Sequence, residues 1–96
     1  MKLSILTRIS EDVLYNWSED FQKEVNNWIL QKCKNNTFLV FKNIKHTEEK
    51  DYYYKYLTID YSTWNCIKNI AYEANIKDYD VYNILCKLYI KYKTVI

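Results

Sequence analysis

The sequence contains neither glycine nor proline among its 96 residues. Glycine provides the positive φ angles and close backbone approach on which phosphate-cradling loops, dinucleotide-binding loops and nucleophile elbows depend. The absence of glycine therefore excludes these common enzyme loops. Turns must use Asn and Asp, which tolerate the left-handed region best among the remaining residue types.

Arginine is also scarce, with one arginine against 13 lysines. Most contacts to anions must therefore use lysine, which is a flexible point charge and lacks the bidentate fork of arginine. Lys, Asn, Ile and Tyr, which have AT-rich codons, together make up 45 of the 96 residues. This bias is typical of a low-GC genome such as that of a bacterium, plasmid, phage or large DNA virus. The net charge of +2 is too small to indicate nucleic-acid binding by itself.

Residues suited to catalysis or metal binding are few. The single histidine, His46, lies in a polar stretch where no apolar surroundings would tune its pKa. The acidic pairs are sequence neighbours, which point apart on a helix and do not form acid/base dyads. Structural zinc sites usually bring their ligands in short-spaced pairs, and no such pairs occur here. We expect no catalytic residues, no metal and no cofactor, and we therefore expect that the protein is not an enzyme.

The three cysteines, Cys33, Cys66 and Cys86, are odd in number and widely spaced. This pattern argues against a disulfide framework and favours buried, reduced thiols. No segment approaches the roughly 18 apolar residues that a membrane span needs. We therefore expect a cytoplasmic protein that does not associate with membranes.

The first third of the chain predicts a strand followed by helix. Apolar and polar residues alternate over 3–9, which indicates a short strand. Ser10 is a suitable N-cap for a helix over 11–35, either continuous or restarting at Ser18, with the Asn35-Asn36 pair as its end.

The middle of the chain predicts a β-hairpin. Residues 37–41 and 52–61 are rich in β-branched and aromatic residues, and the polar residues 45–51 lie between them. Such a hairpin would expose some of its tyrosine hydroxyl groups.

The last third predicts two helices, over 62–75 and 78–93, with Asn75 ending the first. The second helix carries one apolar stripe through Leu85 and Leu88 and another through Tyr82 and Cys86, which favours burial on two sides or a homodimer interface. The sequence thus predicts a small single α+β domain over 1–96, in the order strand, long helix, β-hairpin and two C-terminal helices. The arrangement is winged helix-turn-helix-like or ribbon-helix-helix-like.

Residues 55–92 resemble the ribbon-helix-helix DNA-binding proteins. A short alternating strand precedes a helix in which Trp64, Ile67 and the Ile70-Ala71 pair follow the core spacing of the family, and Asn75-Ile76 stands at its turn. In that family two chains pair their strands, and the resulting ribbon enters the major groove. The resemblance implies that the strand that carries Lys55 contacts DNA and that its outward-facing residues, Tyr56, Thr58 and Asp60, read bases. It also implies that a phosphate is held at the start of the second helix, near Lys77. A second ribbon-then-helix pattern begins at Ile5.

The same helices also have helix-turn-helix proportions. The hairpin would then act as a wing that brings Lys42, Lys45, His46 and Lys50 to phosphates or the minor groove. The second helix would present Asn83, Lys87 and Lys91 to bases and phosphates.

Both arrangements lead to one functional hypothesis, a small non-enzymatic protein that binds double-stranded DNA. Such a protein would be a regulator or a plasmid or phage accessory factor, and we expect it to be a homodimer. The alternative is a protein-interaction module or inhibitor of phage or plasmid type that uses the Tyr-rich strand at 52–56 and binds no nucleic acid.

Overall fold

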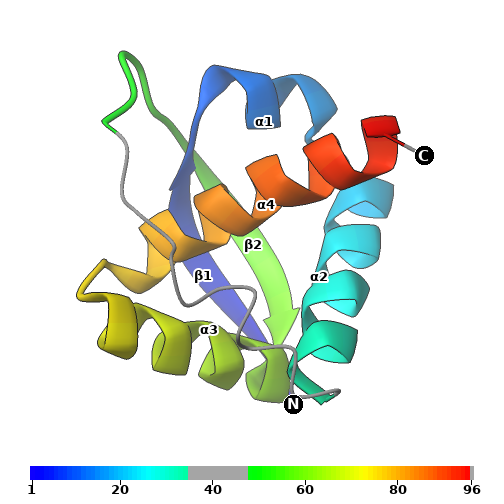
Figure 1. The fold of residues 1–96 in the computed structure, drawn as a ribbon, viewed down its shortest axis with the longest axis vertical. Coiled ribbons are helices and arrows are strands. Elements are labelled where there is room, and N and C mark those ends of the chain that lie inside the picture. The colour runs from blue at the N-terminus through cyan, green and yellow to red at the C-terminus, as the bar shows by residue number, and fades with distance from the viewer. Residues whose placement is uncertain (35–47, 96) are drawn as a thin grey trace.

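The alternating segment at the N-terminus forms a strand whose partner lies far along the chain. The computed structural model describes residues 1–34 and 48–95. In these residues a strand and two helices are followed by a second strand and two more helices, in the order β1–α1–α2–β2–α3–α4 (Figure 1). The described residues thus form a small α+β fold with a two-stranded antiparallel sheet and four helices.

The two strands form an antiparallel ribbon. Strand β1 (Lys2–Ile9) pairs with β2 (Tyr53–Asp60) from Lys2↔Asp60 to Ile9↔Tyr53. The strands predicted at 3–9 and within 52–61 are therefore confirmed. Residues 37–41, the predicted partner of the second strand, lie outside the described residues, and the partner that the structure shows for β2 is β1.

The predicted first helix is divided in two. Helix α1 (Glu11–Asn16) ends at Trp17, which has extended backbone, and α2 (Glu19–Lys34) begins after Ser18. The Ser18 hydroxyl accepts a hydrogen bond of 3.0 Å from the Phe21 backbone N–H, so it caps the start of α2. Of the two alternatives that the sequence left open, the break with a restart at Ser18 is confirmed.

The C-terminal helices end and begin where the sequence predicts. Helix α3 (Tyr61–Ala74) is closed by Asn75, whose φ of 57° and ψ of 45° lie in the left-handed region. Helix α4 (Asp78–Val95) follows directly. Asparagine thus performs the C-cap role that glycine usually fills.

One core joins both halves of the chain. Helix α4 crosses one face of the ribbon (Figure 1) and turns Tyr82, Leu85 and Cys86 fully into the core. By contrast, Leu88 of the first predicted stripe is 36% exposed. The second stripe, through Tyr82 and Cys86, is therefore more completely buried than the C-terminal part of the first stripe at Leu88.

The expectation of three reduced thiols is wrong for two of them. Cys33 near the end of α2 and Cys66 in α3 form a disulfide, with 6.7 Å between their Cα atoms. The sequence spacing did not reveal the pair because only the packing of α2 against α3 brings the two positions together. Cys86 is a free thiol and is buried. Over the described ranges, no helix has both the length and the apolar character that crossing a membrane needs.

Candidate functional site

The face of the ribbon opposite α4 carries a row of exposed side chains. Residues at odd positions of β1 turn toward the core, and so do Leu57 and Ile59 of β2, whereas alternate positions turn outward. We call the exposed outward residues the ribbon face; they are Lys2, Ser4, Leu6, Tyr54, Tyr56, Thr58 and Asp60. The period of two residues in a strand thus separates a core side from an open side.

The centre of the ribbon face is apolar and aromatic. Leu6 is 49% exposed and lies directly opposite Tyr56, which is 70% exposed. Ser4 and Thr58 form the next outward pair toward one end, followed by an ion pair between Lys2 and Asp60 at 4.0 Å. Hydroxyl groups and apolar surface therefore dominate the face, and its charges lie at the end.

A groove of about 660 Å³ borders the ribbon face along β2. Its other wall is the polar side of α2, with Gln22, Lys23 and Asn27. Asn26 fixes this wall, because its side-chain N–H donates to the Thr58 carbonyl at 3.2 Å and its oxygen accepts from the Tyr82 hydroxyl at 2.8 Å. Helix α2 is thereby held beside the outer edge of β2, as Figure 1 shows.

The residues implied by the ribbon-helix-helix resemblance differ in their positions. Tyr56 and Thr58 are exposed on the ribbon face. Lys55 is half-buried and lies opposite Thr7, on the side of the core. Lys77 is exposed at the turn between α3 and α4.

The start of α4 is a poor phosphate site. The Asp78 carboxylate accepts the Tyr79 backbone N–H at 2.7 Å. Asp78 and Asp80 both lie in the first turn, where their negative charge satisfies the positive end of the helix. A phosphate placed there beside Lys77 would meet two carboxylates.

Most of the residues predicted for a wing lie outside the part of the chain that the structure describes. Lys42, Lys45 and His46 lie outside the described residues. Lys50 is described and exposed, three positions before β2 begins.

Two of the three residues predicted on the exposed face of the second helix are not free to contact DNA. Asn83 is only 4% exposed, and its side-chain oxygen accepts a hydrogen bond of 2.9 Å from the Ser10 backbone N–H. Asn83 faces inward because this side of α4 packs against the junction of β1 and α1, where the amide satisfies a buried backbone donor. Lys91 is exposed.

Lys87 is part of a structural ion pair rather than an open surface. Its ammonium group donates to the Glu49 carboxylate, and its side chain is 34% exposed. This hydrogen bond raises the pKa of Lys87 above its ordinary value. The interaction ties α4 to the segment that leads into β2.

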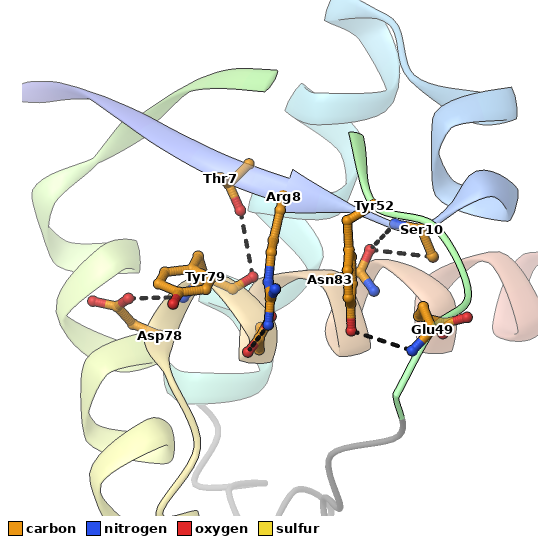
Figure 2. Close-up of polar contacts among 9 residues, drawn as sticks. Thr7, Arg8, Ser10, Glu49, Tyr52, Asp78, Tyr79 and Asn83 are labelled. Carbon is orange, nitrogen blue, oxygen red and sulfur yellow. Dashed lines mark hydrogen bonds and ion pairs between the residues drawn. The ribbon is translucent and has the colours of Figure 1, made fainter. Parts of the chain in front are cut away.

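Sequence reasoning missed the role of the sole arginine. Figure 2 shows the Arg8 side chain between the rings of Tyr52 and Tyr79. Its guanidinium lies 4.1 Å from the Tyr52 ring centroid and makes two hydrogen bonds to Asp80, at 2.9 and 3.0 Å. The hydrogen bonding to Asp80 raises the pKa of Arg8 further above its already high value. The sequence did hold one sign of this role, because a single arginine among 13 lysines suggests a position that needs the planar, bidentate guanidinium group.

The described residues contain no group of three His, Cys, Asp or Glu side chains placed to hold a metal ion. Comparisons with protein-family models, curated proteins and solved structures found no match, so function is inferred from the residues of this chain.

Proposed function

We propose that this protein binds double-stranded DNA through the ribbon face, without catalysis or cofactor. The observation that carries the proposal is the antiparallel ribbon, one face of which packs on the core while the other presents alternate side chains of both strands. The major groove of B-DNA is wide enough to admit a two-stranded β-ribbon.

The order of elements supports the same proposal. Each strand of the ribbon is followed by two helices, β1 by α1 and α2 and β2 by α3 and α4. This is the order that the resemblance to ribbon-helix-helix proteins implies for β2, and β1, where a second ribbon-then-helix pattern begins at Ile5, is followed by two helices in the same way. The helix-turn-helix alternative is less favoured because Asn83 and Lys87 are engaged inside the protein.

The chemistry of the ribbon face fits base edges better than phosphates. The hydroxyl groups of Ser4, Thr58 and Tyr56 can donate to or accept from base edges, and Leu6 offers apolar contact to a thymine methyl group. Phosphate contacts would come from lysines around the face. Lys2 and Lys23 line the groove at one end, and exposed Lys50 precedes the other end.

A second candidate function, a protein-interaction surface, is favoured by one specific observation. Leu6, Tyr54 and Tyr56 are 49%, 68% and 70% exposed and lie together on the ribbon face. Tyrosine is enriched among the residues that dominate binding energy at protein interfaces. On this alternative the protein would be a small interaction module or inhibitor of phage or plasmid type.

Gel-shift titration with a random-sequence duplex at several salt concentrations tests the proposal. DNA binding requires the logarithm of the affinity to fall linearly with the logarithm of the salt concentration, because neutralised phosphates release counterions. We expect Tyr56→Ala to weaken binding by roughly tenfold, which corresponds to about 1.4 kcal/mol. Tyr72→Ala is the matched control, since Tyr72 is 89% exposed on α3, away from the ribbon face.

The outcomes separate the two candidates. Absence of any duplex shift and of heparin retention at low salt would remove the DNA proposal and leave the protein-interaction surface. Salt-dependent binding that Tyr56→Ala and Tyr72→Ala leave equally unchanged would show that DNA contacts another surface.

A further inference from the structure

We infer that a single chain is the complete DNA-binding unit and that its preferred site lacks two-fold symmetry. The inference rests on the proposed function and concerns the same ribbon face. It departs from the expectation of a homodimer that pairs one strand from each chain.

One chain supplies both strands of the ribbon. All eight residues of β1 have partners in β2, from Lys2↔Asp60 to Ile9↔Tyr53. The edge of β2 that faces β1 is therefore occupied within the chain. Beyond the other edge, the Thr58 carbonyl already accepts a hydrogen bond from Asn26 of α2. A second copy is not needed to complete the ribbon.

The ribbon nevertheless has an approximate two-fold axis in its backbone. Helix α1 begins at Glu11 and α3 at Tyr61, so positions 50 residues apart occupy equivalent places in the two halves. Leu6 and Tyr56 are 50 residues apart and are also direct partners across the ribbon. The approximate axis must therefore pass between Leu6 and Tyr56.

The side chains on the two sides of this axis differ. Toward one end the next outward pair is Ser4 with Thr58, two short hydroxyl side chains. Toward the other end Tyr54 lies opposite Arg8, whose side chain turns away from the face to the Asp80 carboxylate of α4, so only the aromatic ring of Tyr54 is exposed there. A symmetric dimer would present the same pair at both ends.

The flanking helices are unequal as well. Helix α1 has 6 residues and α3 has 14, although each directly follows a strand of the ribbon. The polar groove lined by α2 borders the ribbon at the end where Lys2 and Thr58 lie. Side chains and surroundings thus both distinguish the two ends, so the two ends of a bound site must meet different chemistry.

The two ends of the ribbon face should recognise DNA by different kinds of contact. At the Ser4–Thr58 end, hydroxyl groups can form hydrogen bonds with base edges, and the adjacent Lys2 can reach a phosphate. At the Tyr54 end, the aromatic ring favours apolar contact, and Arg8 is withheld from DNA by its hydrogen bonds to Asp80. The central Leu6 and Tyr56 would contact the base pairs between these ends.

Selection from a pool of random-sequence duplexes, followed by native mass spectrometry of the complex with a selected duplex, tests this inference. We expect a non-palindromic consensus and one chain per duplex. Repeating the selection with the Ser4→Ala/Thr58→Ala double variant should relax the preference at one end only. Tyr54→Ala should relax it at the opposite end, and Tyr72→Ala should leave the whole consensus unchanged.

The results distinguish failure of this inference from failure of the proposed function. A palindromic consensus with two chains per site, or relaxation of both ends by a single variant, overturns the single-chain unit while DNA binding stands. If the protein retains no duplex from the pool even at low salt, both the single-chain unit and the proposed DNA binding are overturned. For each variant, circular dichroism that matches the parent protein shows that altered selection does not come from unfolding.

Discussion

At the scale of single residues, Arg8 and Asn83 show how this chain uses polar groups to join distant segments. Arg8 connects β1 to Asp80 of α4, and Asn83 of α4 accepts from the Ser10 backbone N–H. Both contacts fix the start of α4 against the end of β1. In a chain with one arginine, that residue stabilises the fold and does not lie open on the DNA-binding surface that we propose.

The buried thiol of Cys86 should make the folded protein less stable as the pH rises into the alkaline range. Its thiol is fully buried, and burial raises the pKa of Cys86 well above the ordinary value. In the unfolded chain the thiol ionises above about pH 8.5, while in the folded protein it stays protonated. The unfolded state therefore binds fewer protons, and the free energy of unfolding falls as the pH rises, by up to about 1.4 kcal/mol per pH unit.

Urea unfolding between pH 8.5 and 10 measures this effect, with Cys86→Ala as the comparison. The variant should be less stable at pH 7 because it leaves a small cavity, but its stability should fall less steeply across the window. Tyr82 and Lys87, whose pKa values are also raised, are present in both proteins, and because tyrosine and lysine ordinarily ionise near or above pH 10 they contribute mainly at the top of this range and beyond it. Equal slopes for the two proteins would contradict the prediction.

At the scale of elements, the sequence predicted helices and strands well because their signals are local. Ser18 stands where α2 begins, and Asn75 ends α3 in the left-handed conformation. Exposed Tyr56 and Thr58 could also be predicted, because alternation within a strand assigns every second residue to the open face.

The pairing of elements could not be predicted from the sequence. A strand pattern shows that β2 exists but not that its partner is β1, because many strands satisfy the same alternation. The Cys33–Cys66 disulfide was missed for the same reason. Asn83 was misplaced because the apolar arc of α4 is wide, and the rotation of the helix against β1 decides which polar residue is buried.

The disulfide should contribute strongly to stability by linking the end of α2 to α3. Its cysteines are separated by 33 positions, and closing a loop of that size in the unfolded chain corresponds to about 4 kcal/mol in the chain-entropy description. We expect thiol reductant, or the Cys33→Ser substitution, to lower the free energy of unfolding by an amount of this order. Thermal denaturation with and without reductant measures the change.

The Cys33→Ser variant is its own control for the reductant. Its unfolding midpoint should not respond to the reductant, because the remaining thiols have no disulfide to reduce. Three reactive thiols in the denatured, unreduced parent protein, instead of one, would show that the bond does not form.

At the scale of the whole molecule, the buried apolar residues that the structure describes form one cluster drawn from both halves of the chain. Ile9, Val13 and Val25 from the first half are fully buried in the same cluster as Leu57 and Ile67 from the second. The ribbon itself takes one strand from each half. The β1–β2 sheet and this shared cluster therefore require both halves of the chain.

This shared core predicts that a fragment spanning residues 48–96 does not fold alone. Removing the first half takes away β1 and leaves Leu57 and Ile59 without the residues that cover them. A fragment this short also buries only a modest share of its surface on folding, so it has little stability to spare for the loss of these contacts. Circular dichroism of the fragment should show no cooperative thermal transition, and mixing with a fragment spanning 1–47 should restore one.

The informative contrary result is a fragment that folds by pairing β2 with its own copy. Antiparallel self-pairing through Tyr56 would give the symmetric strand dimer that the ribbon-helix-helix resemblance implies, and sedimentation equilibrium would detect it as a dimer. In the intact chain β1 occupies that position, and an intramolecular partner competes at a much higher effective concentration than a second chain. A dimeric, cooperatively folded fragment beside a monomeric intact protein would thus contradict the prediction about the fragment, while showing directly that β1 takes the place of the second copy.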